Sequence, residues 1–70
     1  MKEKSPVVQV NGKSVAAVGQ TIEEYLMEAG YQKDRVAVER NGQILPKPQY
    51  STTCLEDGDV LEIVGFVGGG

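Results

Sequence analysis

The residues best suited to chemistry are the last ones of the sequence. Gly68, Gly69 and Gly70 end it with a carboxylate on residues without side chains, and the bulky apolar Phe66 and Val67 precede them. A frayed terminus is the simpler interpretation, but such a tail would be polar before its glycines. Five extended residues reach about 17 Å, enough to carry a carboxylate into a narrow channel of another protein. We therefore expect a flexible tail over residues 66–70, with Gly70 as the reacting residue and Phe66, Val67, Gly68 and Gly69 contacting a partner.

A carboxylate needs activation before a nucleophile can attack it, because its negative charge repels the nucleophile and oxide is a poor leaving group. Adenylation with ATP would supply a good leaving group. The sequence contains no Gly-x-x-x-x-Gly-Lys-Ser/Thr motif to hold ATP phosphates. We therefore expect no bound cofactor, and ATP used by a partner enzyme. The chain would then be a carrier or substrate and not itself an enzyme.

Other candidate groups are few. Histidine is absent, which removes the commonest general base and metal ligand. Cys54 is the single cysteine, and the charged residues nearest to it, Glu56 and Asp57, are acidic, so nothing in the sequence activates the thiol. A redox or sulfur-accepting role stays possible, but we interpret Cys54 as a small half-buried side chain beside a turn.

Acidic residues gather towards the end of the sequence, at Glu56, Asp57, Asp59 and Glu62, with Glu39 as a further candidate. Their spacing lacks the pattern of a calcium loop, so we predict no metal site. Turn formation by Asp57 and Asp59 is the first interpretation, and docking on a basic protein is the second.

Composition restricts the partners. The net charge of −3 and the pI near 4.7 argue against nucleic acid and favour a basic protein face. No apolar run approaches the roughly 20 residues of a membrane span, and the start does not resemble a secretory signal. One cysteine cannot form an internal disulfide, so we expect a cytoplasmic protein without a membrane segment.

The elements that must position the tail begin with a hairpin and a helix. Residues 7–10 predict a strand, Asn11-Gly12 a two-residue turn, and residues 14–18 the return strand. Thr21 and Glu24 form the pattern of a capping box, and Gly30 ends the helical spacing that starts there.

The second half predicts another hairpin and a final strand. Residues 36–40 and 43–45 flank Asn41-Gly42, and Pro46 and Pro48 confine the next residues to an edge or an irregular segment. Residues 55–59 have the composition of a tight turn. Residues 60–64 are nearly all apolar, which favours a strand inside the sheet.

This order predicts an α+β domain over residues 1–65, with a mixed sheet of four to five strands packed on one main helix. The first and last strands would lie parallel in the centre. The prolines at the edge favour a monomer.

Four segments, VQVNGK, VAVERNGQILPKPQY, LEDGDVLEIV and FVGGG, resemble the small sulfur carrier proteins of thiamine biosynthesis, which have the ubiquitin-like β-grasp fold. The resemblance covers nearly the whole chain apart from the start, MKEKSP. It implies that an adenylating enzyme related to ubiquitin-activating enzymes activates Gly70. It further implies that a sulfurtransferase or cysteine desulfurase supplies sulfur, and that the resulting thiocarboxylate serves thiazole synthase. Gly69 and Gly70 match the Gly-Gly end of that family.

Other interpretations of the same pattern remain open at this point. The small subunit of molybdopterin synthase has the same fold and end, although IVGFVGGG fits the thiamine type better. A ubiquitin-like modifier or interaction module is the alternative from another class. An RNA-binding β-grasp domain is disfavoured by the negative charge.

Overall fold

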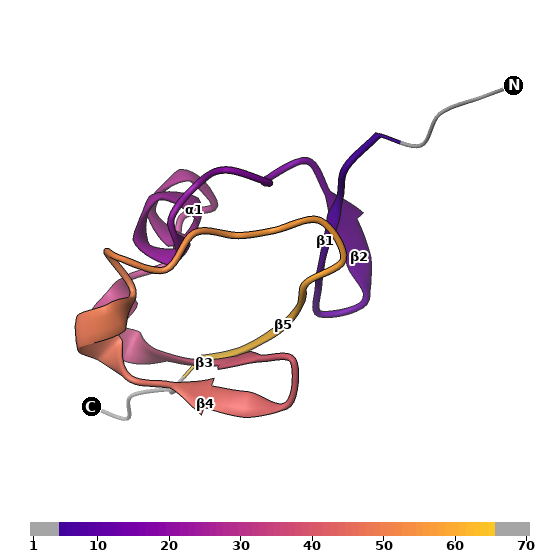
Figure 1. Ribbon diagram of the computed structural model, residues 1–70. Helices are drawn as coiled ribbons and strands as arrows, with labels where there is room; N and C mark the ends of the chain where they lie inside the picture. Colours follow the sequence, from indigo (N-terminus) through magenta and orange to yellow (C-terminus); the bar gives the residue numbers. More distant parts are fainter. Residues whose placement is uncertain (1–4, 66–70) are drawn as a thin grey trace, which may run out of the picture.

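The computed structural model describes residues 5–65, and these form one mixed sheet with a helical layer against it (Figure 1). The strands are β1 (Val8–Val10), β2 (Lys13–Val15), β3 (Val36–Arg40), β4 (Gln43–Leu45) and β5 (Val60–Gly65). The helices are α1 (Ile22–Glu28) and the short 3-10 segments η1 (Lys33–Arg35) and η2 (Lys47–Gln49). The predicted α+β class with a mixed sheet on one main helix is confirmed.

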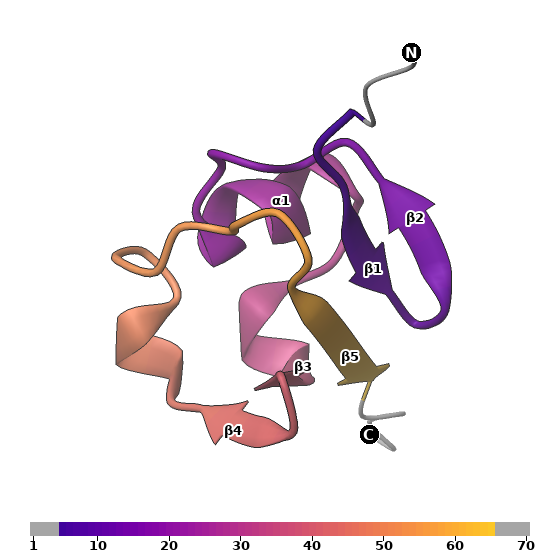
Figure 2. The same ribbon diagram turned by 45° about the vertical axis from the view of Figure 1, so that its right-hand side comes forward.

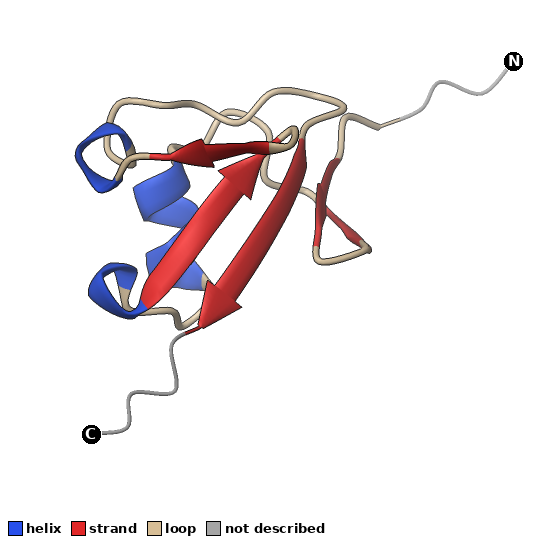
Figure 3. Cartoon of the chain, turned by 90° about the horizontal axis from the view of Figure 1, so that it is seen from below, coloured by secondary structure: helices blue, strands red, loops and turns tan. Residues whose placement is uncertain are grey.

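The strand order is β2-β1-β5-β3-β4. β1 and β5 pair in parallel at the centre, as predicted, and every other neighbouring pair is antiparallel. The sheet curls around α1, which Figures 1 and 2 show from two directions, and Figure 3 shows the helical segments gathered to one side of the strands. β5 therefore runs through the middle of the sheet towards residues 66–70.

Both predicted hairpins form at their Asn-Gly pairs. Asn11 has φ +51° and Asn41 has φ +54°, the left-handed values that this two-residue turn requires. The return strand is shorter than predicted, because β2 ends at Val15 and not at Val18. The chain leaves the sheet there, buries Ala17, and turns back through Gly19, whose amide donates to the carbonyl of Leu55.

The sequence signals at both ends of α1 are confirmed. The amide of Glu24 donates to Thr21 Oγ1, and the amide of Thr21 donates to Glu24 Oε1, which completes the capping box. At the other end Gly30 adopts φ +89°, and the amide of Tyr31 donates to the carbonyl of Leu26, as in a Schellman motif. A helix of two turns is marginal alone, so its buried side chains must hold it on the sheet.

The core lies between α1 and one face of the sheet. Its largest fully buried side chains are Tyr50, Ile22, Leu26, Leu55, Leu61, Val8 and Val38. Tyr50 follows η2 and is only 2% exposed, so it belongs to the core. Burial raises the pKa of its hydroxyl.

Candidate functional site

The predicted site residues, Phe66, Val67, Gly68, Gly69 and Gly70, lie outside the described residues. The structure describes the element that carries them, β5, up to Gly65. Both neighbours of β5 hold it: β1 pairs with its first half, and β3 pairs with it as far as Val36 opposite Gly65. The support of the predicted tail is therefore the central strand of the sheet.

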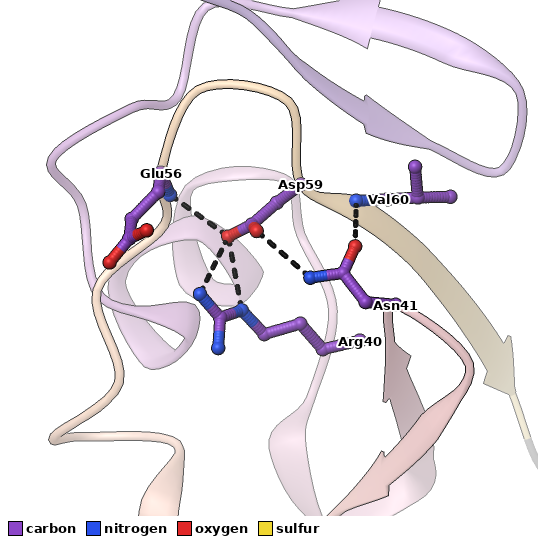
Figure 4. A network of polar contacts seen from close by, with 5 residues as sticks. All are labelled: Arg40, Asn41, Glu56, Asp59 and Val60. Carbon is purple, nitrogen blue, oxygen red and sulfur yellow. Dashed lines mark hydrogen bonds and ion pairs between the residues drawn. The ribbon is translucent and has the colours of Figure 1, made fainter.

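The start of β5 is fixed by a buried carboxylate, that of Asp59, which is 6% exposed. Its Oδ2 accepts from the amide of Glu56 at 2.9 Å and from Arg40 Nε at 3.0 Å, and Oδ1 accepts from Asn41 Nδ2 at 3.0 Å (Figure 4). Asn41 Oδ1 in turn accepts from the amide of Val60 at 2.9 Å. This network joins the turn before β5 to the β3–β4 hairpin.

The protonation of Asp59 follows from these contacts. Burial alone would raise the pKa of its carboxyl, because it disfavours the charged form. The hydrogen bonds from the Glu56 amide, Asn41 and Arg40 outweigh that effect and hold the pKa below its ordinary value of 3.8. Asp59 is therefore an anion that supports the strand, and turn formation, the first sequence interpretation, is the correct one for this residue.

The middle of β5 is held by the other hairpin. Asn11 Oδ1 accepts from the amide of Ile63 at 2.8 Å, and Asn11 Nδ2 donates to the Ile63 carbonyl at 3.2 Å. The backbone ladder between β1 and β5 reaches only the amide of Asn11, which donates to the Leu61 carbonyl. The Asn11 side chain thus imitates a further backbone unit and extends the ladder two residues towards the tail.

A cation holds the start of β3, the strand that pairs with the end of β5. Lys47 Nζ donates to the carbonyl of Val36, the residue opposite Gly65, at 2.9 Å and to the carbonyl of Lys33 at 3.2 Å. It also lies 6.0 Å from the centre of the Tyr50 ring. Lys47 therefore has a structural role, which its place in the sequence did not reveal.

These supporting residues were missed at the sequence level. Asn11 and Asn41 were interpreted through their backbone conformation alone, yet the side chain of each holds β5. The only signal was that both turns use asparagine before glycine, where other residues can also serve.

One face of the sheet is uncovered by any described residue, and we call it the open face. It consists of Gln9, Ser14, Ala37, Glu39, Ile44, Val60, Glu62 and Val64. Ile44 is 75% exposed, Val64 58% and Val60 45%. The prediction that residues 60–64 form a strand inside the sheet is confirmed, but only one face of that strand is buried: Leu61 and Ile63 face the core, and Val60, Glu62 and Val64 face outwards. Exposed apolar side chains on a central strand are typical of an interaction surface.

The remaining candidates do not form a second site. Cys54 is exposed, contrary to the half-buried position expected, and pairs only through an isolated bridge with Thr21. Within residues 5–65 no group of acidic or cysteine side chains is arranged to hold a metal ion, and no pocket is present. In the same part of the chain, no helix is long and apolar enough to cross a membrane.

Comparison with known proteins identifies the family. The model of the ThiS family matches residues 6–70. The chain is 42% identical over 66 residues to the sulfur carrier protein ThiS of Bacillus subtilis, with 91% of this chain and 100% of that protein covered. The crystal structure of the thiamine biosynthesis protein ThiS from Geobacter metallireducens superimposes with a TM-score of 0.74 at 34% identity, covering 91% of this chain and 99% of that one.

Two longer relatives carry a similar segment. The chain is 52% identical over 50 residues to a thiazole synthase of Paramagnetospirillum magneticum and 38% identical over 64 residues to one of Magnetococcus marinus. It spans only 15% and 20% of the length of these proteins. The matches to the family model and to whole proteins of similar length decide the assignment: this chain belongs to the ThiS family, the sulfur carrier proteins of thiamine biosynthesis.

Proposed function

We propose that this protein carries sulfur as a thiocarboxylate on Gly70, at the end of a flexible tail over residues 66–70. The match of the family model through residue 70 is the observation that carries the proposal. A tail that ends in three glycines is costly to order, by roughly 1–2 kcal/mol per residue. Docking of the folded part must offset that cost, which is why a rigid sheet carries the tail.

The proposed reaction starts with activation by a partner. A carboxylate oxygen of Gly70 attacks the α-phosphate of ATP in an adenylating enzyme related to ubiquitin-activating enzymes, and pyrophosphate leaves. A persulfide from a sulfurtransferase or cysteine desulfurase then attacks the carbonyl carbon, and AMP leaves. The carrier and the sulfur donor are then joined by an S–S bond, and a thiol attacks the donor's sulfur atom in that bond. The thiol and the donor become linked by a disulfide, and the thiocarboxylate remains on Gly70. The carrier itself contributes the acyl group and no catalytic residue, and it holds no cofactor.

Delivery to thiazole synthase completes the cycle. The two thiazole synthases that contain a segment similar to this chain support that partner, because proteins that work together are often joined in one chain. We propose that the open face docks the partners while the tail, with Phe66, Val67, Gly68 and Gly69 leading to Gly70, enters the partner's active site. The protein acts as a monomer in the cytoplasm, where thiols stay reduced.

The test is an intact mass after incubation with ATP, the adenylating enzyme and a sulfur donor. The expected result is the exchange of one oxygen for sulfur, located by fragmentation at Gly70. A variant without Gly70 should gain no sulfur and should unfold at the same temperature as the whole chain. A variant without residues 1–4, which lie outside the family match, is the matched truncation and should load normally. Amide adducts on other proteins in place of the thiocarboxylate would contradict the proposal.

A further inference from the structure

Two carboxylates lie side by side in the middle of the open face. Glu39 on β3 is directly opposite Glu62 on β5 in the antiparallel register. Directly opposite residues have their Cβ atoms about 5 Å apart, and like charges in that position oppose folding. Both side chains are exposed, and neither has an ion pair or a hydrogen bond with any residue in the described part of the chain.

No lysine or arginine among residues 5–65 forms an ion pair with Glu39 or Glu62. Arg40 binds Asp59, Lys33 binds Glu23, and Lys47 donates to backbone carbonyls. The described fold therefore brings two negative charges together without neutralising them. Packing does not require this arrangement, because glutamine or threonine would serve on an exposed strand face.

The neighbours of the pair along β3, β4 and β5 on the open face are apolar. Along β5, Val60 lies two residues before Glu62 and Val64 two residues after it. Along β3, Ala37 lies two residues before Glu39, and Ile44 on β4 lies directly opposite Glu39. Protein interfaces usually have the reverse arrangement, since charged residues are depleted from the core of the contact and lie at its rim. A partner that covers these apolar side chains must cover the two carboxylates as well.

Covering unpaired carboxylates is unfavourable unless the partner supplies a positive charge. An arginine fits best, because its planar guanidinium has five donors and can bridge two carboxylates, whereas a lysine presents a single compact charge. We infer that Glu39 and Glu62 receive one arginine side chain of the thiazole synthase that docks on the open face. The inference rests on the proposed function, which supplies the partner, and it gives the open face its specificity.

Variants of the two glutamates should weaken binding without lowering stability. Glu39→Gln and Glu62→Gln keep the size of the side chains and remove one charge each. Each should weaken binding to the purified thiazole synthase of the same organism by about tenfold, while the melting temperature stays the same or rises. Glu62→Lys should raise the melting temperature, because it creates a cross-strand ion pair with Glu39, and should weaken binding further.

The matched control is Glu28→Gln, the same change on α1 in the other layer, where the carboxylate accepts from Gln20 Nε2 and from no other side chain among residues 5–65. It should bind like the wild type. Raising the salt concentration should weaken wild-type binding, and the double variant Glu39→Gln with Glu62→Gln should lose most of that dependence.

The inference is overturned if the glutamine variants bind like the wild type, or if their melting temperatures fall together with their affinities. Its failure can be told apart from failure of the proposed function. If Ile44→Thr weakens binding and the glutamine variants do not, the open face docks the enzyme without a bridging arginine. If wild-type protein binds thiazole synthase and yet never gains sulfur, it is the proposed carrier chemistry that is wrong.

Discussion

The two faces of one sheet differ in how far their side chains are buried. On the face towards α1, Val8, Val38 and Leu61 are completely buried, and on the open face Val64 and Ile44 are mostly exposed. β5 contributes aliphatic side chains to both faces, Leu61 and Ile63 to the covered face and Val60 and Val64 to the open one, so aliphatic character alone does not distinguish them. Burial distinguishes the two faces. Apolar area on the covered face stabilises the fold, whereas apolar area on the open face remains available to a partner.

The comparison extends to the polar groups. On the covered side Asp59 has four contacts from three residues, which satisfy its carboxylate. On the open face Glu39 and Glu62 lie opposite each other, and neither carboxylate has an ion pair or a side-chain hydrogen bond within residues 5–65. The buried anion has its partners within the fold, whereas the exposed pair leaves its charge available to a partner.

The largest expected effect is on the covered face. Leu61→Ala should lower the free energy of unfolding by about 3 kcal/mol, because it removes a fully buried side chain and leaves a cavity. Urea unfolding followed by circular dichroism measures the loss. A loss below about 1 kcal/mol would break the distinction between the faces, since Leu61 would then behave like an exposed residue.

Asp59→Asn should cost about 2 kcal/mol at neutral pH, because it removes the charge that Arg40 and the surrounding donors stabilise. The folded-state pKa of Asp59 is lowered, so its contribution to stability is present above the ordinary value of 3.8 and is lost as the pH falls through the lowered one. The difference between wild type and variant, measured by urea unfolding, should therefore shrink in strong acid. A difference that is independent of pH would show that the charge does not matter.

Asn11→Gly should cost about 1.5 kcal/mol, because the amide and carbonyl of Ile63 each lose a side-chain partner. Glycine adopts the positive φ of this position without strain, so the change removes the side chain without distorting the turn. Hydrogen exchange should accelerate at the Ile63 amide more than at the Val60 amide, which Asn41 holds independently. Equal acceleration at both amides would mean that the two asparagines do not act separately on β5.

The smallest effect on stability is expected on the open face. Val64→Thr preserves the shape and the β-branch of an exposed side chain, and should change the free energy of unfolding by less than about 0.5 kcal/mol. It should nevertheless weaken binding to the adenylating enzyme or thiazole synthase, measured by calorimetry. Unchanged binding to both would remove the open face as a docking surface and leave the tail as the only contact.

Local signals determined much of this protein from the sequence alone. The Asn-Gly turns at 11–12 and 41–42, the capping box of Thr21 and Glu24, and the helix end at Gly30 act within a few residues, so spacing is enough to place them. The motif order that resembles the sulfur carriers identified the family. Among the strands, the length of the second was wrong, because its end depends on where Ala17 finds a buried position.

The tertiary structure alone decided which side of β5 is covered and what holds the strand in place. A run of aliphatic residues does not reveal whether one face or two are buried, since that depends on where the single helix packs. The hydrogen bonds of Asn11 to Ile63 and the opposition of Glu39 to Glu62 join residues 52 and 23 positions apart. Such pairs are set by the register of strands brought together by burial, which no local pattern specifies.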